Sequence, residues 1–165
     1  MYSRILAPID GSATSAQAFD EAIKIARANG AELQPLYVVD LQPIAYDTAA
    51  TFYPDMREAL LEEGRRLGAQ AVERMSREGV EGTPRISAVE PAGYDIAQRI
   101  LHCAEEFGAD LVVMGTHGRR GWRRLVLGSV AERFLRLAHC PVMLVPGREA
   151  EEDAQRREQA AETAD

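Results

Sequence analysis

The amino-acid sequence predicts an α/β fold: a single doubly wound, mostly parallel five-stranded sheet with helices on both faces. Five short apolar runs are typical of strands, and segments with helical periodicity separate them along the chain. This alternation is typical of parallel sheets whose crossover helices pack on both faces. The chain has 165 residues, of which 46% are hydrophobic, and both values suit one domain with a sizeable core.

The expected elements are justified by local patterns taken in chain order. They are a strand over 4–9, a helix that starts in 11–15 and ends at 29–30, a strand over 31–40, a helix over 55–78, a strand over 83–90, a helix over 93–110, a strand over 110–114, a helix over 129–137 and a strand over 140–146. The strands are apolar runs, and the helices carry apolar residues three or four positions apart. Pro35 suggests an irregular start or an edge position for the second strand. Gly64 and Gly68 are unfavourable in the middle of a helix.

Two segments fall outside these elements. Residues 41–54 show no clear period and contain two prolines, which predicts a long loop of the kind that often serves as a lid or binding loop. Residues 147–165 are polar, rich in charge and nearly free of apolar side chains, so we expect a disordered charged tail. The predicted domain therefore covers residues 1–146.

Charge and composition argue against several classes of protein. The formal net charge of −7 does not suit a general nucleic-acid binder. No apolar run approaches the length that crosses a bilayer, and the N-terminus lacks the layout of a signal peptide, so we expect a cytoplasmic protein. Cys103 and Cys140 form no disulfide framework and match no zinc pattern, so we expect both to pack as small apolar residues.

A glycine-rich stretch, GTHGRRGWRRLVLGS over 115–129, follows the fourth predicted strand. It lacks the lysine of the Walker A motif and the glycine spacing of the dinucleotide fingerprint. Its spacing is instead Gly115-x2-Gly118-x9-Gly128-Ser129. Glycines can adopt positive φ and let backbone amides approach anions, and the amides at the start of a helix attract phosphate. The stretch therefore predicts a phosphate site, with a flexible surface loop as the alternative.

The spacing resembles the nucleotide motif of the universal stress protein family, in its ATP-binding branch. The segments RILAPIDGS, LYVVD, ADLVVMGTHGRRG and LGSVAERFLRLAHCPVMLV also resemble that family's strand regions, in the same order. The resemblance implies an adenine-nucleotide alpha-hydrolase-like fold that binds ATP with Mg²⁺ or Mn²⁺. It also implies a homodimer through the C-terminal strand Pro141–Val145, and a nucleotide-dependent regulatory or stress-response role with a regulatory protein partner.

The residues expected to bind the nucleotide lie at the ends of three strands, in the glycine-rich stretch and at the start of the last helix. They are Pro8, Ile9, Asp10, Val38, Met114, Gly115, His117, Gly118, Arg119, Gly128, Ser129 and Val130. Asp10 is also the candidate metal ligand, since nucleotide-bound Mg²⁺ uses one or two carboxylates. The alternative for Asp10 is to help cap the following helix. The same resemblance implies that Val38 offers backbone groups to adenine, and the residue equally suits a core position.

No catalytic constellation emerges from the sequence. The loop could clamp phosphates, but no general base can be named for phosphoryl transfer. A binding or sensing module is therefore the first hypothesis. The alternatives are a slow ATPase or nucleotide-dependent transferase on the same scaffold, and an interaction protein that does not use nucleotide.

Overall fold

The computed structural model describes residues 1–40, 53–89, 95–116 and 127–147. Its helices and strands, in chain order, are β1 (Arg4–Ile9), α1 (Ala13–Asn29), β2 (Glu32–Asp40), α3 (Tyr53–Arg77), β3 (Arg85–Val89), α4 (Ile96–Phe107), β4 (Leu111–Gly115), α5 (Ser129–Leu137) and β5 (Val142–Val145). Of the loop expected over 41–54, the last two residues begin α3 and the others lie outside the described residues. The expected charged tail, apart from Gly147, also lies outside them.

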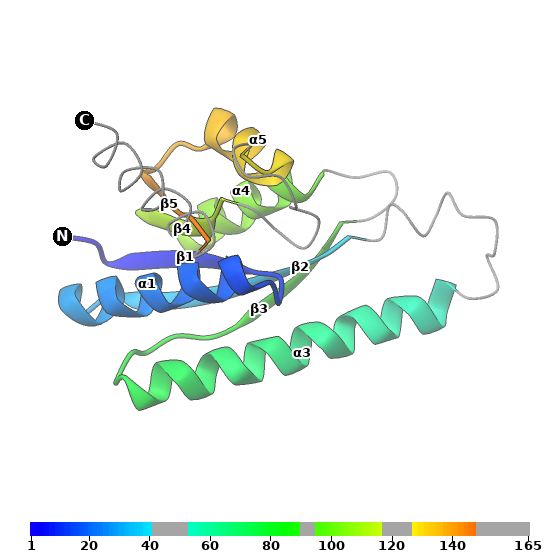
Figure 1. The fold of residues 1–165 in the computed structure, drawn as a ribbon, viewed down its shortest axis with the longest axis horizontal. Coiled ribbons are helices and arrows are strands. Elements are labelled where there is room, and N and C mark those ends of the chain that lie inside the picture. Colours follow the sequence, from blue (N-terminus) through cyan, green and yellow to red (C-terminus); the bar gives the residue numbers. More distant parts are fainter. Residues whose placement is uncertain (41–52, 90–94, 117–126, 148–165) are drawn as a thin grey trace, which may run out of the picture.

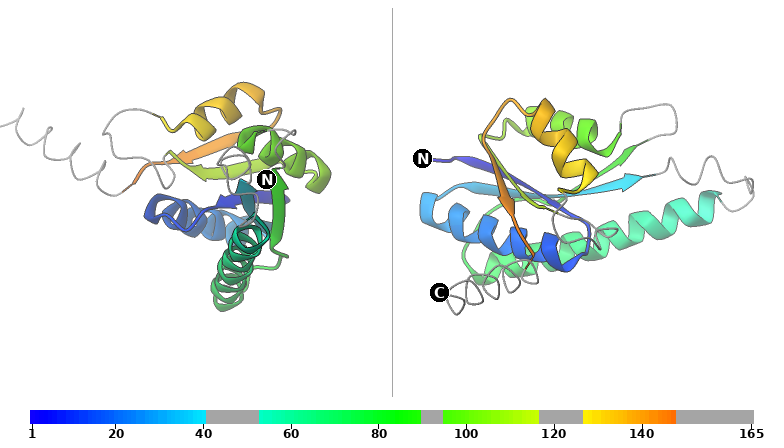
Figure 2. Two further views of the ribbon diagram at one scale, coloured as in Figure 1. Left: turned by 90° about the vertical axis from the view of Figure 1, so that its right-hand side faces the viewer. Right: turned by 45° about the horizontal axis from the view of Figure 1, so that its top comes forward.

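The strands form one sheet in the order β3-β2-β1-β4-β5, and every neighbouring pair is parallel. The predicted five-stranded doubly wound α/β sheet is therefore confirmed, and in the described residues it is wholly parallel. Helices α1 and α3 cover one face, and α4 and α5 cover the other (Figure 1, Figure 2). The strand order switches between β1 and β4, and open sheets of this type hold ligands at the carboxyl ends of the strands beside such a switch.

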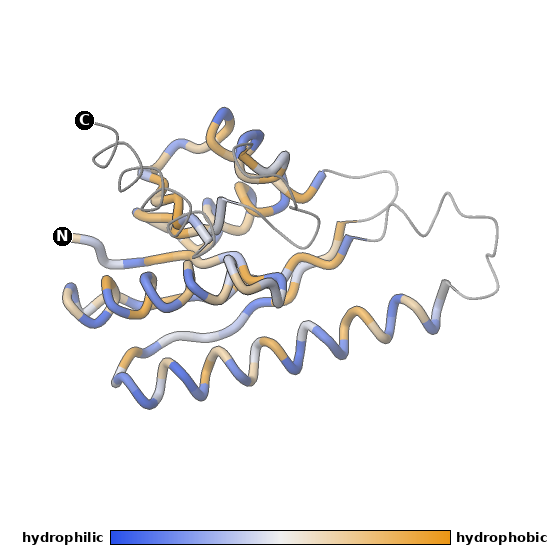
Figure 3. The backbone as a smooth tube through the Cα atoms, viewed as in Figure 1, coloured by the Kyte–Doolittle hydropathy of each residue, from blue (hydrophilic) through white to orange (hydrophobic). Residues whose placement is uncertain are grey.

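Each face of the sheet has its own apolar core. Phe19 of α1 and Met75 of α3 are buried on one face, and Ile100 of α4 and Phe134 of α5 are buried on the other. Residues 111–114 of β4 are buried on both faces, as the continuous apolar run predicts. Figure 3 shows hydrophobic residues recurring at intervals along the helices, with hydrophilic residues between them. In the described part of the chain, no helix combines the length and apolar composition needed to span a membrane.

Pro35 lies inside the sheet, so the expectation of an edge position is wrong. Strand β2 has β1 on one side and β3 on the other. The Leu33 amide donates to the Glu81 carbonyl (2.9 Å), on the side of β2 that faces β3. Peptide groups alternate along a strand, so Pro35 faces the same side, just before the β2–β3 pairing begins at Leu36 and Arg85. Proline therefore lacks its amide hydrogen where no neighbouring strand requires one.

Two glycines let α3 lie close to the sheet. A Cβ on Gly64 would lie 2.7 Å from Cδ1 of the Tyr37 ring, and one on Gly68 would lie 3.2 Å from Cβ of Pro84. Tyr37 is 4% exposed, and its hydroxyl donates to the Glu63 carboxylate of α3 (3.1 Å). The close approach of the helix to this ring explains why a helix interior contains glycine despite its low propensity.

Gly64→Ala is expected to lower the free energy of unfolding, although alanine is the better helix former. Overpacking against the Tyr37 ring costs about 1–3 kcal/mol and the propensity gain is about 1 kcal/mol, so the net loss is roughly 1 kcal/mol. Urea unfolding measures the difference, with the exposed Gln70→Ala of the same helix as the control. A Gly64→Ala protein more stable than the native chain would contradict this packing.

The two edge strands differ in their surroundings. At the β3 edge, Nε of Arg99 from α4 donates to the Ala88 carbonyl (3.0 Å). At the other edge, β5 consists of apolar residues only, and Met143 is 40% exposed. Apolar edge strands are the type that pairs with another chain. Strand β5 thus lies at an edge of the sheet, where a strand that pairs with a second copy must lie.

Candidate functional site

The first and last parts of the glycine motif meet at the carboxyl edge of the sheet. Thr116 follows β4, and its amide donates to the Val145 carbonyl at the end of β5 (3.0 Å). Its own carbonyl accepts the amide of Gly128, which immediately precedes α5 (2.8 Å). One backbone hydrogen bond therefore joins the two ends of the intervening segment, and it places Gly115 near Gly128.

Helix α5 begins at this point without a side-chain cap. Gly128 is its N-cap residue, with φ −60° and ψ 144°, and no side chain of the described residues accepts from the first amides. The helices that follow β1 and β3 start at the same edge, and they are capped by Ser12 and Asp95 respectively. Uncapped first-turn amides and the helix dipole attract anions. Among the helix starts at this edge whose caps the structure describes, that of α5 is the one without a side-chain cap, and its amides are left for a ligand.

Gly115 is a glycine for a reason that the sequence analysis did not identify. The glycines with positive φ in the described residues are Gly11, Gly30, Gly79, Gly82 and Gly108. Gly115 is not among them, so it does not use the conformational freedom expected of it. A Cβ on Gly115 would lie 2.9 Å from Cγ2 of Thr14 and 3.2 Å from its carbonyl carbon and oxygen. The first turn of α1 therefore lies directly against the end of β4.

Asp10 follows β1 and takes part in starting α1. Its Oδ1 accepts the amide of Ser12 (2.9 Å), and its own amide donates to Oγ of Ser15 (3.1 Å). Oγ of Ser12 in turn accepts the amide of Ser15 (3.2 Å). The helix-capping role that the sequence left as an alternative is therefore observed, and the carboxylate lies at the end of β1, beside β4.

The other described residues of the predicted site lie on neighbouring strand ends or on α5. Pro8 and Ile9 are the last two residues of β1. The pairing of β1 with β2 ends at Ile9 and Tyr37, one residue before Val38. Val38 and Val130 pack against the core cluster that contains Met114, on the face covered by α4 and α5. The structure thus brings the predicted residues of β1, β2, β4 and α5 to one edge of the sheet.

Three residues of the predicted site, His117, Gly118 and Arg119, lie outside the described residues. The sequence analysis missed Thr14 and Thr116, which touch Gly115 and Gly128 respectively. It also missed the packing role of Gly147, on which a Cβ would lie 3.0 Å from Oγ1 of Thr14. No local pattern marks these residues, because their partners are distant in the sequence.

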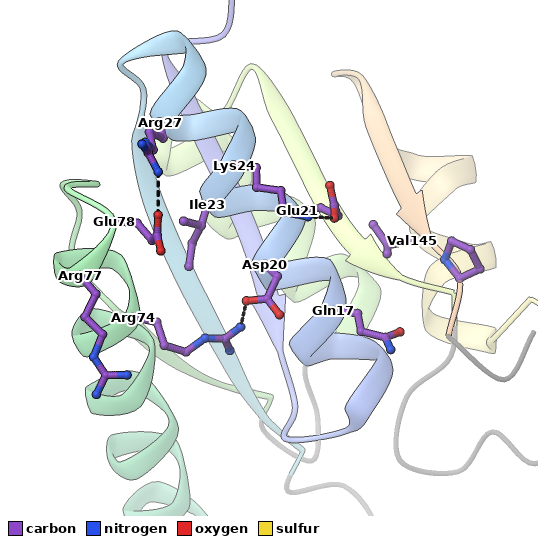
Figure 4. A pocket seen from close by; sticks show the side chains of 11 residues that line it. Gln17, Asp20, Glu21, Ile23, Lys24, Arg27, Arg74, Arg77, Glu78 and Val145 are labelled. Carbon is purple, nitrogen blue, oxygen red and sulfur yellow. Dashed lines mark hydrogen bonds and ion pairs between the residues drawn. The ribbon is translucent and has the colours of Figure 1, made fainter. Parts of the chain in front are cut away.

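A groove of about 720 Å³ runs along the outer face of α1, between α3 and the end of β5 (Figure 4). None of the predicted site residues lines it. Its acidic and basic side chains pair with one another, as in Lys24–Glu21, Arg27–Glu78 and Arg74–Asp20. The Arg74–Asp20 pair joins α1 to α3, and the Arg27–Glu78 pair joins α1 to the residue that follows α3 (Figure 4). The groove therefore presents mainly paired charges rather than a patch of one sign.

The described residues contain no group of three or more His, Cys, Asp or Glu side chains that could hold a metal ion. Cys103 of α4 is fully buried in the core on this helix's side of the sheet, and Cys140 packs against the same cluster. Burial raises the pKa of the Cys140 thiol, which disfavours the thiolate that binds metals. Both cysteines therefore pack as the sequence predicts.

A wholly parallel sheet with an uncapped helix start beside its switch point is typical of α/β proteins that bind ligands at strand ends. The sequence profile of the universal stress protein family matches residues 1–146. The chain is 39% identical over 145 residues to universal stress protein MJ0531 of Methanocaldococcus jannaschii. The match covers 88% of this chain and 82% of that protein. The chain belongs to the universal stress protein family.

Two solved structures share this fold, and the first of them belongs to the same family. A universal stress protein family member from Burkholderia pseudomallei is 43% identical, with a TM-score of 0.74, and the match covers 88% of this chain and 96% of that one. The protein MJ0577 is 26% identical, with a TM-score of 0.76 and the same two coverages. The fold described above is therefore the fold of this family.

Proposed function

We propose that this chain binds an adenine nucleotide, ATP before the others, and acts as a nucleotide-dependent regulatory module in the cytoplasm. The observation that carries the proposal is the hydrogen bond between Thr116 and Gly128, which places the uncapped start of α5 beside the end of β4. The phosphates would lie beside Gly128, against the amides of Ser129 and Val130, and the Ser129 hydroxyl would add a donor. His117, Gly118 and Arg119 would complete the phosphate site.

The adenine and ribose are assigned to the ends of β1, β2 and β4. The Leu33 amide faces β3, and peptide groups alternate along a strand, so the amide and carbonyl of Val38 face the β1 side of β2. The β1–β2 pairing ends at Ile9 and Tyr37, so β1 does not pair with Val38. Universal stress proteins of the same fold, at 20% to 23% identity, have been solved with cAMP, dAMP and AMP. The fold therefore holds adenine nucleotides in those proteins, and the assignment to this chain rests on its own motif and strand ends.

A divalent cation, Mg²⁺ or Mn²⁺, is proposed to accompany the phosphates. Nucleotide-bound Mg²⁺ uses one or two carboxylates together with phosphate oxygens and water. Asp10 supplies one carboxylate at the switch point, which fits this donor set. Since the described residues hold no cluster of three metal-binding side chains, the metal would arrive with the nucleotide.

Asp10→Asn is expected to weaken ATP binding about 10-fold in Mg²⁺, the lower end of the loss of one interaction with a charged group, and to change it little in EDTA. Asparagine keeps an oxygen that accepts the Ser12 amide, so the start of α1 is preserved while the charge is lost. Isothermal titration with and without metal measures the difference. Asp20→Asn, on the exposed side of α1, is the matched control. An equal loss with and without metal would contradict the role of Asp10 at the cation.

Mass spectrometry of the ligand released from the purified protein, followed by titration with ATP, ADP, AMP and GTP, tests the proposed function. ATP is expected to bind most tightly and to remain intact when incubated at stoichiometric concentration. Steady conversion to ADP would instead support an ATPase on the same scaffold. No measurable affinity of the native chain for any adenine nucleotide would refute the proposal.

Deleting residues 148–165 is expected to change the Tm by less than about 2 °C and to leave ATP affinity unchanged, because this polar, charge-rich segment has little apolar surface to bury. Differential scanning calorimetry of the truncated chain measures the shift. A loss of several degrees would show that the tail packs on the domain.

The proposed assembly is a homodimer through Pro141–Val145 of both copies. Pairing of two edge strands satisfies their outward backbone groups in a closed, two-fold contact. A regulatory protein that senses the occupied site is the proposed downstream partner.

A further inference from the structure

Thr14 lies where three chain segments meet. It belongs to the first turn of α1, and its Cγ2 would lie 2.9 Å from a Cβ on Gly115, at the end of β4. Its Oγ1 would lie 3.0 Å from a Cβ on Gly147, just after β5. The side chain thus fits between two positions that carry no side chain of their own.

The contact with Gly115 bears on the start of α5. Gly115 is followed by Thr116, whose amide is held by Val145 and whose carbonyl holds the amide of Gly128. A change in the contact between Thr14 and Gly115 would therefore shift the neighbouring Thr116. Because the Thr116 carbonyl accepts the Gly128 amide, that shift would pass to the start of α5, whose amides are proposed to hold phosphate.

We infer that Thr14 is a positioning residue of the nucleotide site, and that Gly115 is required in the motif because Thr14 packs against it. The nucleotide part of this inference rests on the proposed function, whereas the packing part rests on the distances alone. A glycine needed only for phosphate matters when nucleotide is bound. A glycine that admits Thr14 already matters in the free protein.

The test compares Gly115→Ala, Thr14→Ser and the double variant, first without nucleotide. Gly115→Ala is expected to lower the Tm by about 3–8 °C, because its Cβ overlaps Cγ2 of Thr14. Thr14→Ser removes that methyl group and keeps the hydroxyl, so alone it is expected to lower the Tm by about 1–3 °C. In the Gly115→Ala background the same change is expected to raise the Tm by about 2–4 °C, the reversal that marks two residues in contact.

The same variants are then titrated with ATP and with adenosine. Gly115→Ala is expected to weaken ATP binding about 10-fold, as expected for one weakened hydrogen bond to a charged group, and to change adenosine binding less than about 2-fold. Only the phosphates reach the start of α5, so the loss should be confined to ATP. Thr14→Ser is expected to restore most of the ATP affinity of the Gly115→Ala protein.

Gly64→Ala is the matched control, because its added Cβ meets Tyr37 and Thr14→Ser should not restore its Tm. The inference is overturned if Gly115→Ala keeps the native Tm without nucleotide while it loses ATP affinity. It is also overturned if adding Thr14→Ser to the Gly115→Ala protein fails to raise its Tm. A failure of the proposed function looks different: the native chain would bind no ATP. That result would refute the nucleotide role of Thr14, and the reversal in Tm would still establish the packing contact.

Discussion

Gly128→Val is expected to abolish ATP binding while the chain stays folded. The backbone of Gly128, with φ −60° and ψ 144°, is open to any residue, so valine adds no backbone strain. Its branched side chain would instead occupy the space in front of the first amides of α5. Loss of two hydrogen bonds to a charged group, at about 1.5–3 kcal/mol each, corresponds to a weakening of about 100-fold or more. Isothermal titration measures the affinity, and circular dichroism checks the fold.

Two milder variants at the start of α5 are expected to lose less ATP affinity than Gly128→Val. Gly128→Ala is expected to fall between the native chain and Gly128→Val. Ser129→Ala removes one hydroxyl donor and keeps the helix amides, so it is expected to weaken binding by about 1–2 kcal/mol. Ser76→Ala, at an exposed position of α3, is the control. Native ATP affinity in a folded Gly128→Val protein would show that the start of α5 is not the phosphate site.

Val142→Pro is expected to convert the proposed homodimer into a folded monomer. The Val112 amide donates to the Pro141 carbonyl, and the Thr116 amide donates to the Val145 carbonyl. Because peptide groups alternate along a strand, those of residues 141, 143 and 145 face β4, and the Val142 amide faces the open edge. Proline at this position removes a donor that only a partner strand would use. Analytical ultracentrifugation at micromolar concentration measures the change.

Met143→Pro is the matched comparison for that variant. The Met143 amide faces β4, so proline there disrupts pairing within the chain and is expected to lower the Tm more than Val142→Pro does. The pairing through β5 would be contradicted by a native chain that sediments as a monomer, or by a Val142→Pro protein that remains a dimer.

Short windows of sequence were sufficient to predict the elements of this fold. Asn29 and Gly30 predict the end of α1, and Gly30 adopts the left-handed conformation there, with φ 64°. The apolar run of β4 predicts a strand buried on both faces, as residues 111–114 are. In these cases the deciding neighbours lie within a few positions along the chain, so local composition carries the information.

The roles of individual glycines and prolines could not be predicted in the same way. Gly115 is required by Thr14, which lies on the first helix, and Gly64 is required by the ring of Tyr37. Pro35 is tolerated because β3 has not yet begun to pair at its level. Local rules about positive φ, helix propensity and edge strands miss these reasons, because each depends on a neighbour from another part of the chain. The motif spacing likewise indicated Gly128 and Ser129 as candidates but carried no sign of Thr14.

In the proposed dimer, the bond from Arg99 to Ala88 bears on how many copies can assemble. A sheet with two available edges can add a copy at each side and grow into an open-ended ribbon. Here a guanidinium group from the chain's own α4 occupies a carbonyl of the β3 edge, at 3.0 Å. Pairing of β5 with β5 uses the remaining edge of both copies at once. Self-association of this kind stops at the dimer, so a higher protein concentration would increase the fraction of dimer and would not start fibrils.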